Sequence, residues 1–218
     1  DGWFARVALV DPETTLSMPP QVTASTGGDA LCQAIEAFTS IAASAITDAL
    51  AMQAIELIGR SLLRAYMVGS DITAREGMSL GSLMAGMAMA SARLGAVHGM
   101  AHPLGSHYRI PHGVVCGLLL PYTMAYNLPY ATEKYAEVAH LLGEKVENLN
   151  LETAAHRAVA RVRDLLTKVA LSTHLGEFGV KEDGLDVIIE ESLPSGSFKH
   201  NPRPLGAEDA RRILTEAL

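Results

Sequence analysis

The sequence predicts an all-α fold of about nine helices, with no sheet of three or more strands. The chain has 218 residues, enough for one large domain or two small ones with a substantial core. Hydrophobic residues make up 49% of it and aromatic residues only 5%, whereas a β-sandwich would need more β-branched and aromatic residues. Because apolar residues also recur at helical spacing, closely packed helices are the architecture that the sequence favours.

One short N-terminal segment departs from the helical pattern. Residues 4–10 form an apolar run that Asp11 and Pro12 stop, and this run predicts a strand. A lone strand has no sheet to join, so we expect its partner strands to lie in a domain that precedes residue 1. The lack of an initiator methionine agrees with a fragment or a processed chain.

The first long helical region carries a polar pair. We expect it to open at Ser17 and to be interrupted and restarted at residues 26–29, where two glycines precede Asp29. Apolar residues at 31, 34, 35 and 38 then form one stripe, while Asp29, Gln33 and Glu36 lie on or beside another face. Asp29 is either the N-cap of this helix or, with Gln33 one turn later, part of a pair that points into a cleft.

Two further helices follow in the sequence. Residues 46–68 predict an amphipathic helix capped by Thr47 or Asp48, and residues 71–93 predict a second helix rich in glycine, alanine, serine and methionine. Small side chains let helices approach closely. We therefore expect the second helix to be buried, with close backbone contacts at Gly81 and Gly86.

The C-terminal part of the chain is more polar. Its isolated histidines, His140, His156 and His174, are assigned to the surface or to packing. Residues 193–205 predict an ordered loop or a lid. Amphipathic helices with charged outer faces are predicted at residues 131–142, 151–174, 181–191 and 207–218.

A cluster of histidines precedes this part. Four of the eight histidines fall within residues 98–112: His98, His102, His107 and His112. His98 and His102 are four residues apart, which places both imidazoles on one face of a helix. Pro103 and Gly105 weaken that helix, and Pro111 can begin the next one with His112 just inside it. Two helices that meet at a kinked loop, each with a histidine, indicate a metal site. The alternative is a set of separate, buried, hydrogen-bonded histidines.

Charge and cysteine content narrow the classes of partner. The net charge is −7 and no basic run exists, so nucleic acid is not expected as a partner. The longest stretch without charged residues, 110–132, contains three prolines, an asparagine and a histidine, and predicts a buried helix with its loops rather than a membrane span.

Cys32 and Cys116 form no disulfide framework and are expected as small core residues in a reducing, cytoplasmic compartment. No signal peptide and no glycine-rich dinucleotide-binding turn is found.

Several segments together resemble the iron-containing (group III) alcohol dehydrogenase family. They occur in family order: VALVDP at 7–12, TLSMPP at 15–20, TGGDALCQAIE at 26–36, HGMAHPLG at 98–105, PHG at 111–113 and HNPR at 200–203. The resemblance implies the family's C-terminal helical domain, of the dehydroquinate synthase-like kind. Residues 13–218 would form this metal- and substrate-binding domain, and residues 1–12 a remnant strand of the nucleotide-binding domain.

The resemblance also implies a set of site residues. The family's metal ligands fall on Asp29, His98 and His112, and the fourth, a histidine in the family, falls on Gln33. An amide oxygen is a weaker and harder ligand than imidazole. His102 matches the histidine near the reacting carbon and the nicotinamide. The implied activity is an NAD(P)-dependent alcohol dehydrogenase or aldehyde reductase acting on a small alcohol or aldehyde, with Fe²⁺ or Zn²⁺, in a homo-oligomer.

Two other functions stay open at this point. One is a metal-free reductase resembling maleylacetate reductases, in which Gln33 marks a relaxed site. The other is a binding or assembly module that no longer catalyses. Metal content distinguishes the metal-dependent dehydrogenase from the metal-free reductase. Turnover distinguishes either enzyme from the binding or assembly module.

Overall fold

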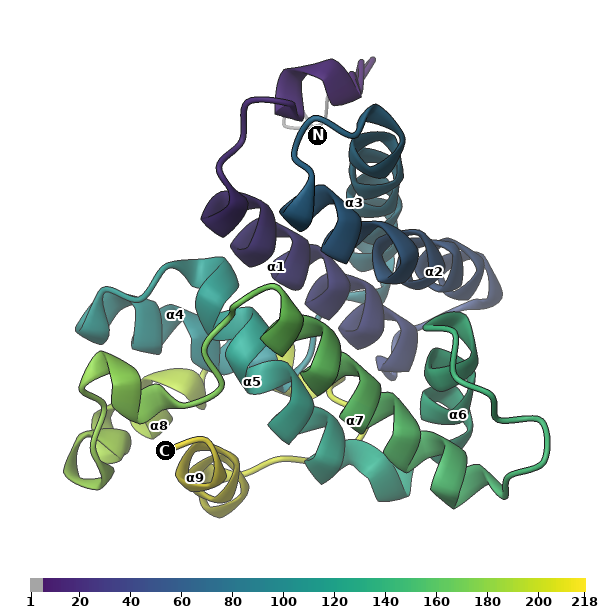
Figure 1. Ribbon diagram of the computed structural model, residues 1–218. Helices are drawn as coiled ribbons and strands as arrows, with labels where there is room; N and C mark the ends of the chain where they lie inside the picture. Colours follow the sequence, from purple (N-terminus) through teal and green to yellow (C-terminus); the bar gives the residue numbers. More distant parts are fainter. Residues whose placement is uncertain (1–5) are drawn as a thin grey trace.

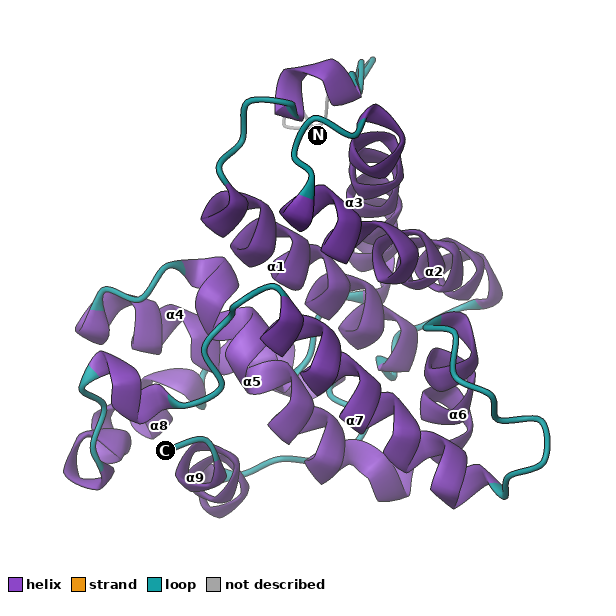
Figure 2. Ribbon diagram, viewed as in Figure 1, coloured by secondary structure: helices purple, strands orange, loops and turns teal. Residues whose placement is uncertain are grey.

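The computed structural model describes residues 6–218, and every regular element in that range is helical (Figures 1 and 2). It contains nine α-helices and five short 3₁₀ helices, which confirms the predicted all-α fold. The α-helices are α1 Pro20–Thr39, α2 Ala45–Met67, α3 Ile72–Ala92, α4 Ala96–Tyr108, α5 His112–Asn127, α6 Thr132–Leu141, α7 Leu151–Lys168, α8 Leu185–Ser192 and α9 Ala207–Glu216. The 3₁₀ helices are η1 Pro12–Thr15, η2 Leu128–Tyr130, η3 Leu175–Phe178, η4 Glu182–Gly184 and η5 Gly196–His200.

The predicted N-terminal strand is not found where the structure describes it. Val7 and Leu9 belong to an extended, exposed segment without strand pairing, and Phe4 lies outside the described residues. A strand is stabilised by hydrogen bonds to a neighbouring strand, and residues 6–218 supply none. This part of the prediction is therefore wrong for residues 7–10.

Helix α1 is continuous, so the predicted break at residues 26–29 is also wrong. Gly27 and Gly28 lie inside the helix and are buried. A Cβ atom on Gly28 would lie 2.8 Å from Leu171 Cδ1, so this glycine permits close packing rather than a turn. The helix begins at Pro20, which places Asp29 in its interior and excludes the N-cap role for its carboxylate.

Helices α2 and α3 pack against each other and against α1. Ser44 caps α2, through a capping box with Thr47, and Asp71 caps α3. The expected close approach is confirmed at Gly81, where a Cβ atom would lie 2.7 Å from Ile58 Cγ1. The expected close approach is wrong at Gly86, where a Cβ atom would meet no atom of the described residues within 4 Å.

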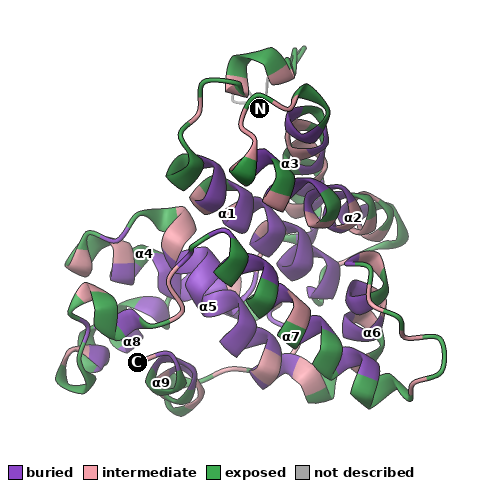
Figure 3. Ribbon diagram, viewed as in Figure 1, coloured by how far each residue is buried: buried purple, intermediate pink, exposed green. Residues whose placement is uncertain are grey.

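Helices α4 and α5 carry the histidine segment. Helix α4 continues through Pro103 and Gly105 and ends at Tyr108, and the next residue, Arg109, has a left-handed φ of 56°. Helix α5 begins at His112, directly after Pro111, and most of its residues are buried in the middle of the molecule (Figure 3). No single helix among the described residues is long and apolar enough to cross a membrane. Helices α3 and α4 pass that test only as a pair, with a bend of 106° between them.

The C-terminal part packs around α5. Helix α7 ends at Lys168, six residues before the predicted end, where Ala170 takes a left-handed φ of 57°. The predicted loop at 193–205 is anchored rather than loose, because Phe198 and Asn201 are buried within it. This segment reaches back to the start of α4 through a hydrogen bond from the Ala96 amide to Asn201 Oδ1, at 3.3 Å.

Candidate metal centre

Three of the residues that the resemblance implies as metal ligands converge from three helices. Asp29 comes from α1, His98 from α4 and His112 from α5. The Nε2 atom of His98 lies 3.2 Å from Asp29 Oδ1, and the Nε2 atom of His112 lies 3.9 Å from the same oxygen. The two imidazole rings are 5.4 Å apart between centroids. The fold thus brings together residues that are up to 83 positions apart in the chain.

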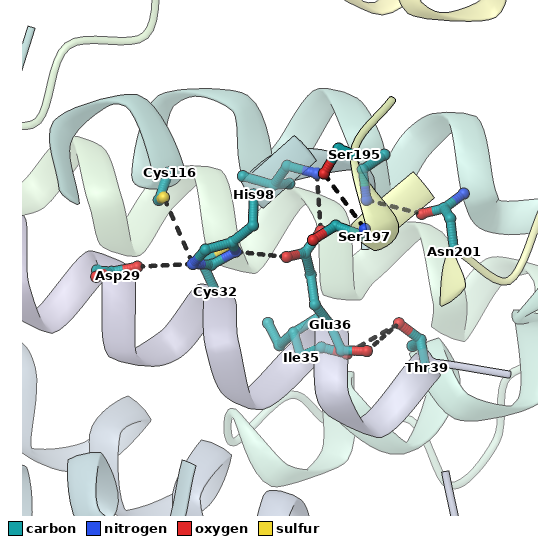
Figure 4. Close-up of polar contacts among 12 residues, drawn as sticks. Asp29, Cys32, Ile35, Glu36, Thr39, His98, Cys116, Ser195, Ser197 and Asn201 are labelled. Atoms are coloured by element: carbon teal, nitrogen blue, oxygen red, sulfur yellow. Dashed lines mark hydrogen bonds and ion pairs between the residues drawn. The ribbon is translucent and has the colours of Figure 1, made fainter. Parts of the chain in front are cut away.

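A buried carboxylate holds the His98 ring in place. Glu36 Oε2 lies 2.6 Å from His98 Nδ1, and Glu36 Oε1 accepts a hydrogen bond from the Val97 amide at 2.8 Å (Figure 4). A carboxylate at Nδ1 fixes the proton on that nitrogen and leaves the Nε2 lone pair free. Nε2 is the nitrogen that faces Asp29. His98 is therefore oriented as a histidine ligand is oriented in metal proteins.

The Oδ1 atom of Asp29 is buried and receives no hydrogen bond from the described residues. His98 Nε2 lies 3.2 Å from this oxygen, but the two groups are not aligned for a hydrogen bond. A buried oxygen that accepts no hydrogen bond destabilises the fold. A cation bound between the Asp29 oxygen and the two imidazole nitrogens would remove this cost. The donor set of one carboxylate and two imidazoles fits a divalent metal ion.

Cys116 completes this cluster, and sequence reasoning missed it. Its Sγ atom lies 3.4 Å from His112 Nε2 and 3.8 Å from His98 Nε2. One donor atom from each of Asp29, His98, His112 and Cys116 lies within 4.8 Å of all the others. The signal was available: Cys116 follows His112 by four residues, the same spacing that linked His98 to His102. Sequence reasoning placed Glu36 on the polar face of its helix but missed its role, which depends on the contact with His98 on another helix.

The cluster changes the proton affinities of its members. Burial lowers the pKa of His98, but contacts with Asp29, Cys116 and Glu36 outweigh it and raise that pKa to about 12. Burial likewise raises the pKa of Asp29, yet the neighbouring His98 and His112 bring it below the usual value. The contact with Cys32, followed by those with His112 and His98, lowers the pKa of Cys116 to about 5. Without a cation these contacts therefore favour a protonated His98, and a metal ion bound at Nε2 would displace that proton.

The remaining predicted residues lie at the edge of the cluster or away from it. Gln33 follows Asp29 by one turn on α1 and is half-buried, and its amide makes no hydrogen bond with any residue that the structure describes. The exposed ring of His102 lies 5.3 Å from the ring of His112, between centroids. His107 points elsewhere, with Nε2 3.0 Å from Glu191 Oε1.

A cavity of about 710 Å³ lies between η1, α1 and α3, but it is separate from these residues. Its lining includes Met18, Ala30 and Met87, and none of Asp29, His98, His102 or His112. The cavity therefore gives no evidence about a ligand at the cluster.

Fold and cluster together define a helical domain organised around a partly buried histidine–carboxylate centre. Residues 23–218 match the family described as the Fe-containing alcohol dehydrogenase family, C-terminal. The chain belongs to this family, as its sequence motifs had implied.

Individual relatives agree with this assignment. The chain is 42% identical over 211 residues to 1,3-propanediol dehydrogenase of Klebsiella pneumoniae, covering 97% of this chain and 54% of the relative. It is 41% identical over 204 residues to lactaldehyde reductase of Escherichia coli K12, covering 94% and 53%. A crystal structure of 1,3-propanediol oxidoreductase matches with a TM-score of 0.94 and 42% identity, over 95% of this chain and 55% of that one. The chain thus spans about half the length of the curated relatives it matches.

Proposed function

We propose that the chain forms the metal- and substrate-binding part of an NAD(P)-dependent alcohol dehydrogenase or aldehyde reductase. The observation that carries this proposal is the convergence of His98 and His112 on the buried Oδ1 atom of Asp29, which receives no hydrogen bond from residues 6–218. Family membership and relatives named for propanediol and lactaldehyde support a small alcohol or aldehyde as the substrate.

Asp29, His98 and His112 are the residues that would hold a divalent ion such as Fe²⁺ or Zn²⁺. Gln33, at the position where the family has a fourth ligand, can offer an amide oxygen. A bound divalent ion supplies positive charge that polarises a carbonyl oxygen or stabilises an alkoxide. Glu36 keeps His98 in the tautomer that leaves Nε2 free toward the centre.

His102 is suited to proton transfer beside this centre. Its side chain is exposed, and its ring is close to the ring of His112. Imidazole both accepts and donates protons near neutral pH. In our proposal His102 takes the proton of the substrate hydroxyl during oxidation and returns it during reduction.

The nicotinamide cofactor would supply or accept the hydride. The sequence has no glycine-rich turn for its pyrophosphate, so we propose that an N-terminal nucleotide-binding domain supplies that contact. In this arrangement residues 13–218 form the helical domain, and residues 1–12 connect it to the other one. A cytoplasmic location and a homo-oligomeric state stay predictions.

The test is a turnover assay of the full-length protein, which joins these residues to the nucleotide-binding domain, with NAD⁺ or NADP⁺ and 1,3-propanediol, and of the reverse reaction with lactaldehyde; residues 1–218 alone are expected to be inactive. The assay is repeated after metal removal and after addition of Fe²⁺ or Zn²⁺. We expect turnover that is lost on metal removal and restored by the added ion. His156→Ala, an exposed histidine on α7, serves as the control that keeps full activity.

Two other results would overturn the proposal in different ways. Turnover that persists unchanged after metal removal would favour the metal-free reductase. Metal binding without turnover of any alcohol or aldehyde, with either nicotinamide cofactor, would favour the binding or assembly module.

A further inference from the structure

We infer that Cys116, rather than Gln33, is the fourth ligand of the metal centre, so that the ion is held by one carboxylate, two imidazoles and one thiolate. This inference rests on the proposed function in so far as Asp29, His98 and His112 hold an ion. It adds a ligand that the family motifs did not indicate.

The distances around the cluster agree with a tetrahedral site. Metal–ligand bonds of about 2.0 Å to nitrogen or oxygen and about 2.3 Å to sulfur place neighbouring donors of a tetrahedron roughly 3.3 to 3.6 Å apart. The observed separations from His98 Nε2 and His112 Nε2 to Asp29 Oδ1 are 3.2 Å and 3.9 Å. Those from the same two nitrogens to Cys116 Sγ are 3.8 Å and 3.4 Å. The four measured edges scatter around the expected range.

Cys116 reaches the centre from a rigid and buried position. It lies one turn after His112 on α5, the central helix, and its side chain is fully buried. Because α5 positions both residues, the sulfur needs no rearrangement of the backbone to contact an ion beside His112.

The second cysteine provides an internal comparison. Cys32 Sγ lies 3.9 Å from His98 Nδ1, the nitrogen that contacts the Glu36 carboxylate. Cys116 Sγ approaches Nε2, the nitrogen that faces Asp29 (Figure 4). The two thiols therefore lie toward opposite nitrogens of the His98 ring, and only Cys116 is on the side of the ion.

The ligand set has consequences for metal choice. A thiolate is a soft ligand that prefers Zn²⁺ to harder ions, whereas an amide oxygen is hard and weakly basic. A neutral amide also leaves the ion with less negative charge around it than a thiolate does. We therefore expect the centre to select Zn²⁺ over Fe²⁺ more strongly than a site with the Gln33 amide as its fourth ligand would.

Cobalt absorption spectroscopy tests the inference without any measurement of activity. The metal-free protein is titrated with Co²⁺, and its spectrum is recorded for the wild type, Cys116→Ser, Cys32→Ser and Gln33→Ala. We expect a sulfur-to-cobalt charge-transfer band in the near ultraviolet for the wild type, Cys32→Ser and Gln33→Ala. Cys116→Ser should lose the band and bind Zn²⁺ at least about tenfold more weakly.

X-ray absorption of the wild-type protein loaded with Zn²⁺ gives a second readout that depends on no variant. A sulfur neighbour at about 2.3 Å is expected. Visible cobalt bands without a charge-transfer band, together with a zinc shell of only nitrogen and oxygen, would overturn the thiolate ligand and leave the metal centre intact. Absence of any bound Co²⁺ or Zn²⁺ in the wild type would instead refute the metal centre itself.

Discussion

Glu36 Oε2 lies 2.6 Å from His98 Nδ1, and this contact joins the last turn of α1 to the first turn of α4. The other carboxylate oxygen of Glu36 accepts a hydrogen bond from the Val97 amide, one of the free N–H groups at the start of α4. A single buried carboxylate thus both caps a helix and sets the tautomer of a histidine. Its role as a positioning residue gives the first prediction.

Glu36→Gln should weaken Zn²⁺ binding by about 10- to 100-fold, the usual effect of losing a partner behind a metal-ligating histidine. The glutamine can still accept from Val97, so the helix start is largely preserved. Metal affinity is measured by competition with a chelator, and Glu152→Gln, at an exposed position on α7, is the control. Equal affinities of the two variants would show that Glu36 only stabilises the fold.

His102→Ala should separate catalysis from metal binding. If His102 relays the substrate proton, turnover should fall by about 10²- to 10⁴-fold. Zn²⁺ affinity should stay unchanged, because the His102 side chain is exposed at the edge of the cluster. Steady-state kinetics and a metal titration of the same preparation check both parts. A parallel loss of metal affinity would assign His102 to the ligand set instead.

Alanine at two glycines of α3 should change stability in opposite directions. Gly81→Ala would place a Cβ atom 2.7 Å from Ile58 Cγ1 and 3.4 Å from the Ala54 carbonyl, and should destabilise the protein by about 1–3 kcal/mol. The Cβ atom of Gly86→Ala would meet no atom of residues 6–218 within 4 Å, and this variant should stabilise the protein by about 0.5–1 kcal/mol through the higher helix propensity of alanine. Thermal unfolding of both variants is the measurement. Melting temperatures shifted in the same direction would contradict the packing described for α3.

Arg75→Lys should destabilise the junction of η1, α1 and α3 although it keeps the charge. The buried guanidinium donates to Thr23 Oγ1 at 2.7 Å, to the Gly69 carbonyl at 2.9 Å and to the Met18 carbonyl at 3.2 Å. An ammonium group cannot reach three acceptors spread around a planar fork, so a loss of about 1–3 kcal/mol is expected.

Chemical denaturation measures this loss, and Arg212→Lys, at an exposed pair on α9, is the matched control. The control should change the free energy of unfolding by less than about 0.5 kcal/mol. An Arg75→Lys protein as stable as the control would mean that the three hydrogen bonds contribute nothing.

The helices could be predicted because their signal is local. Apolar spacing located all nine α-helices, with errors mainly at their ends. The predicted cap of α2, Thr47 or Asp48, was wrong, because Ser44 caps that helix. The glycine pair at residues 27 and 28 misled the prediction, since a glycine that opens a turn and one that admits a neighbouring helix are identical in sequence. The N-terminal strand failed for the opposite reason: strand formation depends on a partner that the described residues do not contain.

The site could be predicted only in part. Asp29, His98 and His112 followed from motifs of the family, and the fold brings them together. The role of Glu36 could not be predicted, because its partner His98 is 62 residues away in the sequence, on another helix. Cys116 was interpreted as a core residue, and burial alone would support that interpretation. Only its placement beside two imidazole nitrogens distinguishes it from a packing cysteine.

The central claim is that Asp29, His98 and His112 hold a divalent ion, and a calorimetric titration of metal-free protein with Zn²⁺ tests it most directly. His112→Ala is the decisive variant because this side chain is 40% exposed, so its removal should leave the fold intact. We predict that the wild type and His156→Ala bind one equivalent with the same affinity and that His112→Ala binds at least about tenfold more weakly. A wild type that takes up no Zn²⁺, or a His112→Ala protein that binds it as tightly as the wild type, would contradict the account.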